Sequence, residues 1–198
     1  MRGPWTLTAK LYTSGISFLV LALASISLTL WVTWSLEGGA AAVNEAGRMR
    51  MQTYRLALQV SGNPDPAVAL VLMRSFEESI DLLRSGDPSR PLFVPWSATS
   101  HERFEKVTEK WVELREKWLR ERPTPAQAAR DAGEFVQLVD AFVAAIESQI
   151  ARLTAILHMF QLAMMGLAIG SAVVMLYAGY LFVLNPLARL QRGLTALR

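Results

Sequence analysis

Two long stretches of the chain are apolar and carry no formal charge. Residues 11–36 and residues 159–188 contain no Asp, Glu, Lys or Arg. A helix of about 20 apolar residues is long enough to cross the hydrocarbon core of a bilayer. The pattern therefore predicts a two-pass membrane protein. Its expected parts are a cytoplasmic tail at 1–10, a first span at 11–36, an external sensor domain at 37–158, a second span at 159–184 and a cytoplasmic segment at 185–198.

Between the spans, turn residues separate stretches that are compatible with helix. The chain favours a helix over 40–60, then meets a helix-stopping cluster at 61–66. Asp65 as N-cap and Pro66 at the first helical position predict a second helix that ends at Ser85. Three prolines in residues 87–97 predict a loop.

A third helix is expected after Ser100, because apolar side chains follow at spacings of 3, 4, 3 and 4. This heptad seam consists of Phe104, Val107, Trp111, Leu114 and Trp118. The other positions are mostly charged, so they predict a solvated outer face. We expect ion pairs there at i, i+4, between Glu102 and Lys106 and between Glu113 and Lys117.

From Ala126 to Asn185 no proline interrupts the sequence, which predicts one helix of about sixty residues, or ~90 Å at 1.5 Å per residue. The first span is likewise expected to continue outward as a helix past Glu37, with Gly38-Gly39 loosening it. The predicted fold is all-α: an antiparallel four-helix bundle whose first and last helices are the membrane helices themselves.

After Pro186, leucines at 3, 4, 3 spacing predict the beginning of a cytoplasmic coiled coil. No catalytic apparatus is visible, so we expect no enzymatic activity and no catalytic residue in this fragment. We interpret it as the amino-terminal part of a longer protein.

The distribution of charge predicts the orientation in the membrane. All seventeen acidic residues lie between Glu37 and Glu147, whereas the flanking segments carry five basic residues and no acidic one. By the positive-inside rule both ends are cytoplasmic, and the bundle lies in the periplasm of a bacterial inner membrane. The pI of about 9.5 then reflects topology and not nucleic-acid binding. Cleavage after the small residues at 38–42 is an alternative, but the first apolar run is longer than a signal h-region.

The chain contains no cysteine, which excludes a disulfide framework, a thiolate zinc site and a cysteine nucleophile. No metal site and no cofactor are predicted. His101 and His158, the only histidines, would be the haem or metal ligands if the chain were instead a cofactor-bearing membrane subunit. Neither histidine has a second ligand beside it in the sequence. A histidine that is hydrogen-bonded or lies at the membrane interface is more common than one that binds haem or metal.

The segment 43–57 carries the chemistry that the sequence offers. At 100° per residue Arg50 shares one helix face with Val43 and Ala57, which predicts that it lies in a buried seam. Arg48 lies about 200° away, on a flank, so the two arginines cannot face the same partner.

A buried, unpaired guanidinium is costly, so Arg50 requires a partner. If the seam meets its copy in a homodimer, two Arg50 side chains ~6 to 8 Å apart repel each other by roughly 2 to 3 kcal/mol at a dielectric of ~20. A small planar oxyanion between the two guanidinium groups, with room beside Gly47, would replace this repulsion by attraction. Nitrate fits this description and nitrite nearly does. From the residues alone, pairing of Arg50 with Glu45 or Asp140 inside the bundle is an equal alternative.

The string NEAGRMRMQTYRLA, residues 44–57, resembles the P-box of nitrate/nitrite sensor histidine kinases. The order of span, P-box helix, bundle and span is also similar, and Asn185-Pro186-Leu187 resembles the start of a HAMP module. The resemblance implies a homodimer that binds nitrate or nitrite at its interface and signals to a kinase and its response regulator. The implied ligand-binding residues are Arg50, Gly47, Asn44, Arg48, Met51 and Tyr54.

Arg48 departs from this pattern, because the nitrate sensors are expected to have a small polar residue there. The Arg-x-Arg-Met arrangement also resembles the type IV pili methyl-accepting chemotaxis transducer domain. Thr53-Tyr54-Arg55, however, is closer to the nitrate form. A chemotaxis transducer input domain with another ligand is therefore the second hypothesis.

Overall fold

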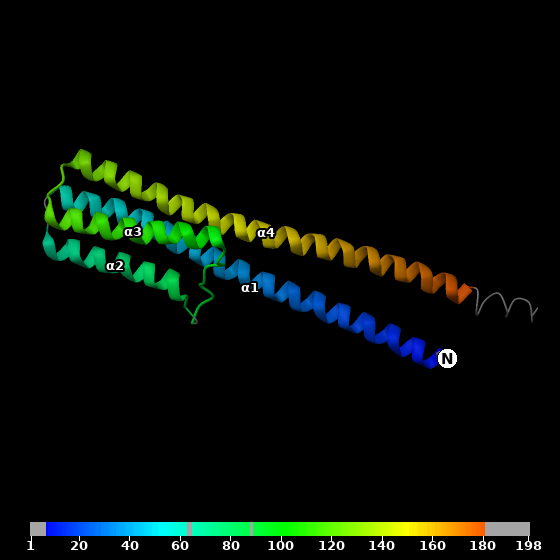
Figure 1. Ribbon diagram of the computed structural model, residues 1–198. Coiled ribbons are helices and arrows are strands. Elements are labelled where there is room, and N and C mark those ends of the chain that lie inside the picture. The colour runs from blue at the N-terminus through cyan, green and yellow to red at the C-terminus, as the bar shows by residue number, and fades with distance from the viewer. Residues whose placement is uncertain (1–6, 63–64, 88, 181–198) are drawn as a thin grey trace, which may run out of the picture. The chain divides into compact units, whose positions relative to one another are not determined.

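The computed structural model describes residues 7–62, 65–87 and 89–180 (Figure 1). This part of the chain is almost entirely helical and contains no strand, which confirms the all-α prediction. The four helices are α1 (Leu7–Ser61), α2 (Pro66–Ser85), α3 (Ala98–Arg120) and α4 (Pro125–Gly179).

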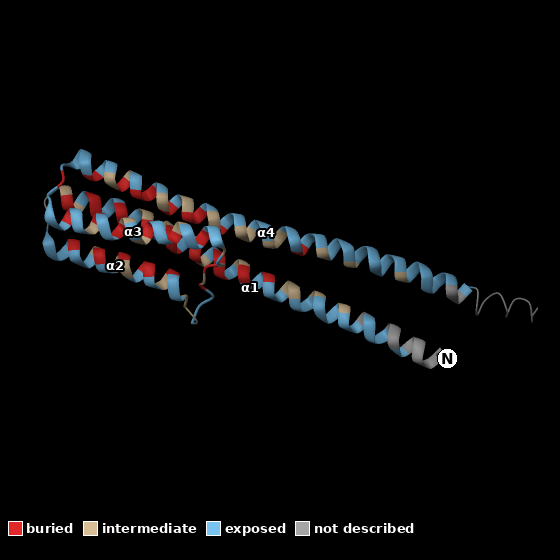
Figure 2. Ribbon diagram, in the orientation of Figure 1, coloured by how far each residue is buried: buried red, intermediate tan, exposed pale blue. Residues whose placement is uncertain are grey.

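Two compact units divide the chain. The first, residues 28–155, is a four-helix bundle made of the second part of α1, all of α2 and α3, and the first part of α4. Short connections join α1 to α2 and α3 to α4, and a longer loop, residues 86–97, joins α2 to α3. Neighbours in sequence run antiparallel (Figure 1). Buried side chains line the inner faces of these helices, whereas the outer faces are exposed (Figure 2).

The second unit takes in residues 1–27 and 156–198, of which the structure describes 7–27 and 156–180. Both described segments are helical, and most of the side chains described there are apolar and exposed (Figure 2). They belong to α1 and α4, the two helices that are long and apolar enough to cross a membrane. The boundaries of the spans stay predictions. The expected HAMP start at 185–198 lies outside the described residues.

Local signals position the ends of α2 and α3. Asp65 is the N-cap of α2 as predicted: its carboxylate accepts a hydrogen bond from the Ala67 N–H at 2.9 Å, with Pro66 at the first position. The expected start of α3 after Ser100 is wrong by three residues. Ser97 is the N-cap, and the side chains of Ser97 and Ser100 each accept a hydrogen bond from the other's backbone N–H, forming a capping box.

The bundle core is built around aromatic rings. All five residues of the predicted α3 seam are buried, which confirms the heptad interpretation. Trp111 stacks on Phe76 from α2, with ring centroids 4.0 Å apart, and Phe104 packs against Phe142 from α4 at 5.2 Å. Rings from three helices therefore pack together in one core, and burial of these large aromatic surfaces stabilises it.

On the surface of α3 one of the two expected ion pairs is present. Lys106 Nζ lies 2.6 Å from the carboxylate of Glu102, as predicted. The pair between Glu113 and Lys117 is not formed. Glu113 instead pairs with Lys110 at 2.8 Å, and Lys117 reaches Asp131 on α4 at 2.7 Å. Lys117 thus pairs with a carboxylate on a neighbouring helix and not with one on its own helix. Residue spacing within α3 cannot predict such a contact between helices.

The expectation that Gly38-Gly39 loosens α1 is also wrong, because the helix continues through both residues. A Cβ on Gly38 would lie 2.2 Å from Cε1 of Phe93, and one on Gly39 would lie 2.5 Å from Cδ1 of Ile150. The two glycines therefore let the α2–α3 loop and α4 approach the backbone of α1 closely.

Candidate functional site

The segment 44–54 lies on α1 within the bundle, and one strip of it faces away from the core. We call residues 40, 44, 47, 51, 54 and 58 the outer strip; they follow one another at spacings of 4, 3, 4, 3 and 4. Asn44 is exposed and Gly47 is half-buried. Met51, Tyr54 and Leu58 are 53%, 48% and 74% exposed. Four of the six predicted ligand-binding residues thus lie on this strip: Asn44, Gly47, Met51 and Tyr54.

Arg50 lies beside the strip and reaches α4. Its Nη1 donates a hydrogen bond to Asp140 Oδ1 at 2.8 Å, and the two side chains are 42% and 49% exposed. A Cβ on Gly47 would lie 3.5 Å from Nη2 of Arg50, an ordinary contact distance. The ion pair with Asp140, one of the alternatives that the sequence left open, is the arrangement in the single chain.

In the single chain Arg50 is not buried beside Val43 and Ala57, and its burial in a seam between two copies stays a prediction. Ala57 belongs to the bundle core, and Val43 packs against that core. The side chain of Arg50 emerges between α1 and α4 and remains half-exposed. Ala57 is in the core because α1 must contact both α2 and α4, which makes the core face of α1 wide enough to include position 57.

Arg48 extends in the opposite direction, toward α2. Its Nη2 lies 2.6 Å from Glu45 Oε1 and donates a hydrogen bond to the Ser79 hydroxyl at 3.0 Å. The prediction that Arg48 and Arg50 face different partners is therefore confirmed. At 100° per residue, each arginine lies about 80° from the centre of the outer strip, on opposite sides.

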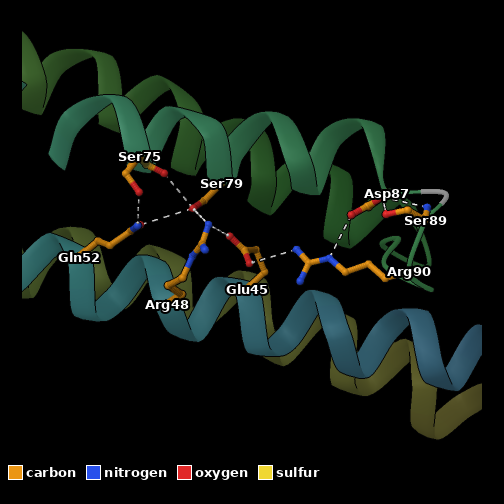
Figure 3. A network of polar contacts seen from close by, with 8 residues as sticks. All are labelled: Glu45, Arg48, Gln52, Ser75, Ser79, Asp87, Ser89 and Arg90. Carbon is orange, nitrogen blue, oxygen red and sulfur yellow. Dashed lines mark hydrogen bonds and ion pairs between the residues drawn. The ribbon is translucent and has the colours of Figure 1, made fainter. Parts of the chain in front are cut away.

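Glu45 is the buried charge of this segment, although the sequence indicates it only as an alternative partner of Arg50. Its side chain is 5% exposed, and Figure 3 shows it between the guanidinium groups of Arg48 and Arg90. Arg90, from the α2–α3 loop, lies 4.0 Å from Oε2. Oε1 is close to Arg48 but lacks the geometry of a hydrogen bond. The carboxylate is thus neutralised by two cations, as a buried charge requires.

Further polar contacts extend this network to both sides (Figure 3). Gln52 Nε2 donates to the Ser75 hydroxyl at 3.0 Å, and the Ser79 hydroxyl lies 3.4 Å from the Gln52 side-chain oxygen. On the loop side, Arg90 Nε donates to Asp87 Oδ2 at 3.1 Å. The network joins α1, α2 and the α2–α3 loop.

The network depends on an ionised Asp87. The Ser89 hydroxyl and backbone N–H donate hydrogen bonds to Asp87 Oδ1 at 2.6 and 2.9 Å. These bonds, and secondarily Arg90, hold the pKa of the Asp87 carboxyl below its ordinary value of 3.8. Asp87 therefore carries its charge at neutral pH and orients Arg90.

A signal for Glu45 is present in the sequence. It lies among Ala42, Ala46 and Met49, which are buried at helical spacing, so its side chain must begin on the core side of α1. Arg48 at i+3 is the natural partner of such a carboxylate. Ser79 and Arg90 belong to other elements and have no comparable local signal. Within the described residues, no three His, Asp or Glu side chains form a group that fits a metal ion.

The site is therefore a polar segment of one helix, with cations on both flanks and an uncovered strip between them. Residues 31–135 match the family of PilJ, the type IV pili methyl-accepting chemotaxis transducer N-terminal domain. The chain belongs to the PilJ family. The matched PilJ region begins in α1, contains α2 and α3, and ends in α4, so it includes the whole segment 44–54. A comparison with curated proteins finds no match.

Membership in the PilJ family decides between the two hypotheses at the level of the domain. It supports a signal-transducer sensor domain and favours the chemotaxis transducer interpretation over the nitrate/nitrite sensor histidine kinase. The PilJ match does not support the P-box identification.

Proposed function

We propose that this chain is the ligand-sensing input module of a bacterial transmembrane signal transducer. The observation that carries the proposal is the PilJ match, which falls on a four-helix bundle. The first and last helices of that bundle are also the two helices suited to crossing a membrane. A helix shared between sensor and membrane transmits a shift without an intervening joint. The coupling required between two signalling states is only about 1–3 kcal/mol.

The proposed topology places both ends in the cytoplasm and residues 37–158 in the periplasm, with spans at 11–36 and 159–184. The asymmetry of charge described above supports it. The absence of native cysteine allows a direct test. Gln127→Cys, on the exposed start of α4, should react with a membrane-impermeant maleimide in whole cells, and Arg198→Cys only after lysis. The reverse pattern would exclude this topology.

For the ligand we propose nitrate or nitrite, bound where the outer strips of two copies meet in a homodimer. Asn44, Gly47, Met51 and Tyr54 would form the contact surface, and Arg48 and Arg50 would supply positive charge at its edges. Gly47 leaves space beside Arg50. The half-exposed pair of Arg50 with Asp140 is weak enough to be exchanged for an anion.

The ligand proposal is tested by calorimetric titration of the detergent-solubilised chain with sodium nitrate and sodium nitrite, using sodium chloride as the anion control. Nitrate or nitrite should release saturable heat that Arg50→Ala abolishes. Arg55→Ala is the matched control, because it removes an exposed arginine from the same helix. Equal heat from the parent chain and from Arg50→Ala, or no heat from either anion, rejects an oxyanion site at Arg50.

The sensor role is tested separately from the ligand. A hybrid that joins residues 1–198 to the output part of a methyl-accepting transducer should show ligand-dependent output in cells. We propose that the output partner of this module is either a methyl-accepting domain or a histidine kinase with its response regulator. A hybrid whose output stays constant across a broad panel of small solutes, while the protein is inserted and folded, contradicts the sensor assignment.

A further inference from the structure

The α2–α3 loop packs against α1 beside the outer end of the predicted first span. The ring of Phe93 lies on Trp34, which is inside that span, with a centroid distance of 4.1 Å. A Cβ on Gly39 would lie 2.5 Å from Cδ1 of Ile150 on α4 and 3.5 Å from Cγ of Pro95 in the loop. All these residues belong to the bundle unit, so the loop, α1 and α4 meet at one level of the bundle.

The same level marks the edge of the apolar part of each long helix. Glu37 is the first charged residue of α1 after the uncharged run. Arg152 is the last charged residue of α4 before residues 153–188, which contain no Asp, Glu, Lys or Arg. The headgroup layer of a bilayer is roughly 5–8 Å thick on each side of the hydrocarbon core. The proposed spans therefore bring this level of the bundle into or next to the headgroups of the outer leaflet.

Exposed tryptophans gather at this level. Trp31 and Trp34 on α1 are 52% and 54% exposed, and Trp96 at the end of the loop is 40% exposed. Trp111 and Trp118, farther along α3, are instead buried in the core. Indole rings favour the interface between membrane and water, where the ring is shielded and the N–H still finds an acceptor. Their distribution therefore favours contact of this end of the bundle with lipid headgroups.

A groove of about 390 Å³ lies at the same end of the bundle, between the start of α3 and α4. The polar side chains that line it are those of Ser97, Thr99, Ser148, Gln149 and Arg152, and no acidic residue of the described chain lines it. Arg152 is exposed and forms no ion pair with another described residue. Hydroxyl, amide and guanidinium groups donate hydrogen bonds, and an unopposed guanidinium suits a phosphate group. The chemistry of the groove thus selects an anion.

We propose that this end of the bundle is a lipid-contact surface, and that the groove binds the phosphate group of an anionic phospholipid in the outer leaflet. Arg152 pairs with the phosphate, the hydroxyl groups of Ser97 and Ser148 donate to its oxygens, and Trp96 lies among the headgroups. A choline headgroup is less favoured, because its cation competes with Arg152 for the phosphate. The inference rests on the proposed membrane topology but is independent of the proposed oxyanion site at Arg50.

Nitroxide labels on single cysteines measure the depth of this surface, because the native chain has no cysteine. The full chain is placed in nanodiscs of phosphatidylcholine and phosphatidylglycerol, and oxygen and a water-soluble nickel chelate serve as relaxing agents. A label on Leu23→Cys should lie in the hydrocarbon, one on Thr99→Cys at the headgroups and one on Gln127→Cys in water.

Two outcomes of the depth measurement would overturn the proposal, and they are distinguishable. If the Thr99 label is as accessible to the nickel chelate as the Gln127 label, while the Leu23 label is in hydrocarbon, the lipid contact is wrong and the topology stands. If the Leu23 label is in water, the topology is wrong and the lipid contact fails with it.

Soluble short-chain lipids test the groove itself. A bimane dye on Thr99→Cys, at the groove, reports binding in the detergent-solubilised full chain. Dihexanoyl phosphatidylglycerol should shift its emission saturably, and dihexanoyl phosphatidylcholine should require a several-fold higher concentration. Inorganic phosphate at the same concentrations should produce no shift. An equal response to inorganic phosphate would indicate a site for soluble anions, and equal half-saturation by the two lipids would indicate no selection of charge; either result overturns the proposal.

Arg152→Gln should raise the half-saturating concentration of phosphatidylglycerol about threefold to tenfold, because one charge-assisted contact close to water is lost. Arg130→Gln is the matched control and should leave that concentration unchanged. It removes another exposed arginine from α4, ~33 Å away along the helix at 1.5 Å per residue. Circular dichroism verifies that both variants are folded. An unchanged half-saturating concentration in Arg152→Gln would overturn the assignment of the groove.

Discussion

The ring of Phe93 lies against Gly38, so closely that a Cβ on the glycine would come within 2.2 Å of the ring carbon Cε1. The Phe93 N–H also donates to the Gly38 carbonyl oxygen at 3.5 Å. The Phe93 ring also packs on Trp34, with a centroid distance of 4.1 Å. The α2–α3 loop is therefore held against α1 at a position where any side chain on α1 would displace it.

Gly38→Ala should destabilise the chain by about 1–3 kcal/mol, because the ring of Phe93 must leave its place against Trp34. This loss exceeds the gain of about 1 kcal/mol that alanine brings in helix propensity. Gly39→Ala should cost less, since the atom it meets is the terminal Cδ1 of Ile150, which can rotate away. Thermal unfolding followed by circular dichroism measures both effects.

Gly133→Ala is the matched control, because no atom lies within 4 Å of a Cβ at this position of α4. It should stabilise the chain by about 0.5–1 kcal/mol. Adding Phe93→Ala should remove most of the extra cost of Gly38→Ala. If Gly38→Ala behaves like Gly133→Ala, the close approach of Phe93 is not present in solution.

Arg48→Ala should cost about 2 kcal/mol in the free energy of unfolding, because it leaves the buried Glu45 carboxylate with only Arg90, 4.0 Å away. In a Glu45→Gln background the same change should cost much less, since an amide needs no counter-charge. A double-mutant cycle from urea unfolding gives the coupling energy. If the unfolding free energies lost in Arg48→Ala and in Glu45→Gln simply add in the double variant, Glu45 is solvated and not held by Arg48.

Asp140→Asn should change stability by less than about 1 kcal/mol, because both members of its pair with Arg50 are nearly half exposed. If Arg50 binds an oxyanion, the same variant should lower the nitrate Kd several-fold, since the competing carboxylate charge is gone. Glu147→Gln, two turns along the same exposed side of α4, is the control and should leave the Kd unchanged. Weaker nitrate binding in Asp140→Asn would assign Asp140 a different role.

The contribution of Asp87 to stability should depend on pH in one direction. Because the pKa of its carboxyl is lowered in the folded chain, the folded state binds this proton less readily than the unfolded state. Its stabilising effect is complete above about pH 5 and disappears as the pH falls through the folded-state pKa. The difference in unfolding free energy between the parent chain and Asp87→Asn should accordingly shrink in acid. A constant difference from pH 7 to pH 3 would contradict the hydrogen bonds of Ser89.

Elements defined by local signals are predictable from the sequence. Asp65 and Pro66 specify the start of α2 because a cap and its first turn involve only adjacent residues. The α3 seam is equally clear, because a heptad spacing on a charged helix leaves one orientation for the core. The start of α3 is less certain in principle, since Ser97 and Ser100 can both serve as caps and form one motif together.

Contacts between elements are what the sequence does not reveal. The sequence offers Glu45 and Asp140 as equal partners of Arg50 inside the bundle, and only the packing of α1 against α4 selects Asp140, ninety residues later. Gly38 is ambiguous for the same reason: a glycine in a helix either loosens it or admits a neighbour, and only the position of Phe93 distinguishes the two. Which face of α1 points into the bundle depends on where α2 and α4 pack against it. Their positions place Ala57 inside and Met51 outside.

The outer strip leaves Met51, Tyr54 and Leu58 against solvent in a part of the chain that is predicted to lie outside the membrane. Apolar side chains aligned along one helix favour self-association, and association stabilises the folded state by mass action. The melting temperature of this chain should therefore rise with protein concentration, and Leu58→Glu should flatten that dependence. Every comparison of variants then requires a single, stated protein concentration.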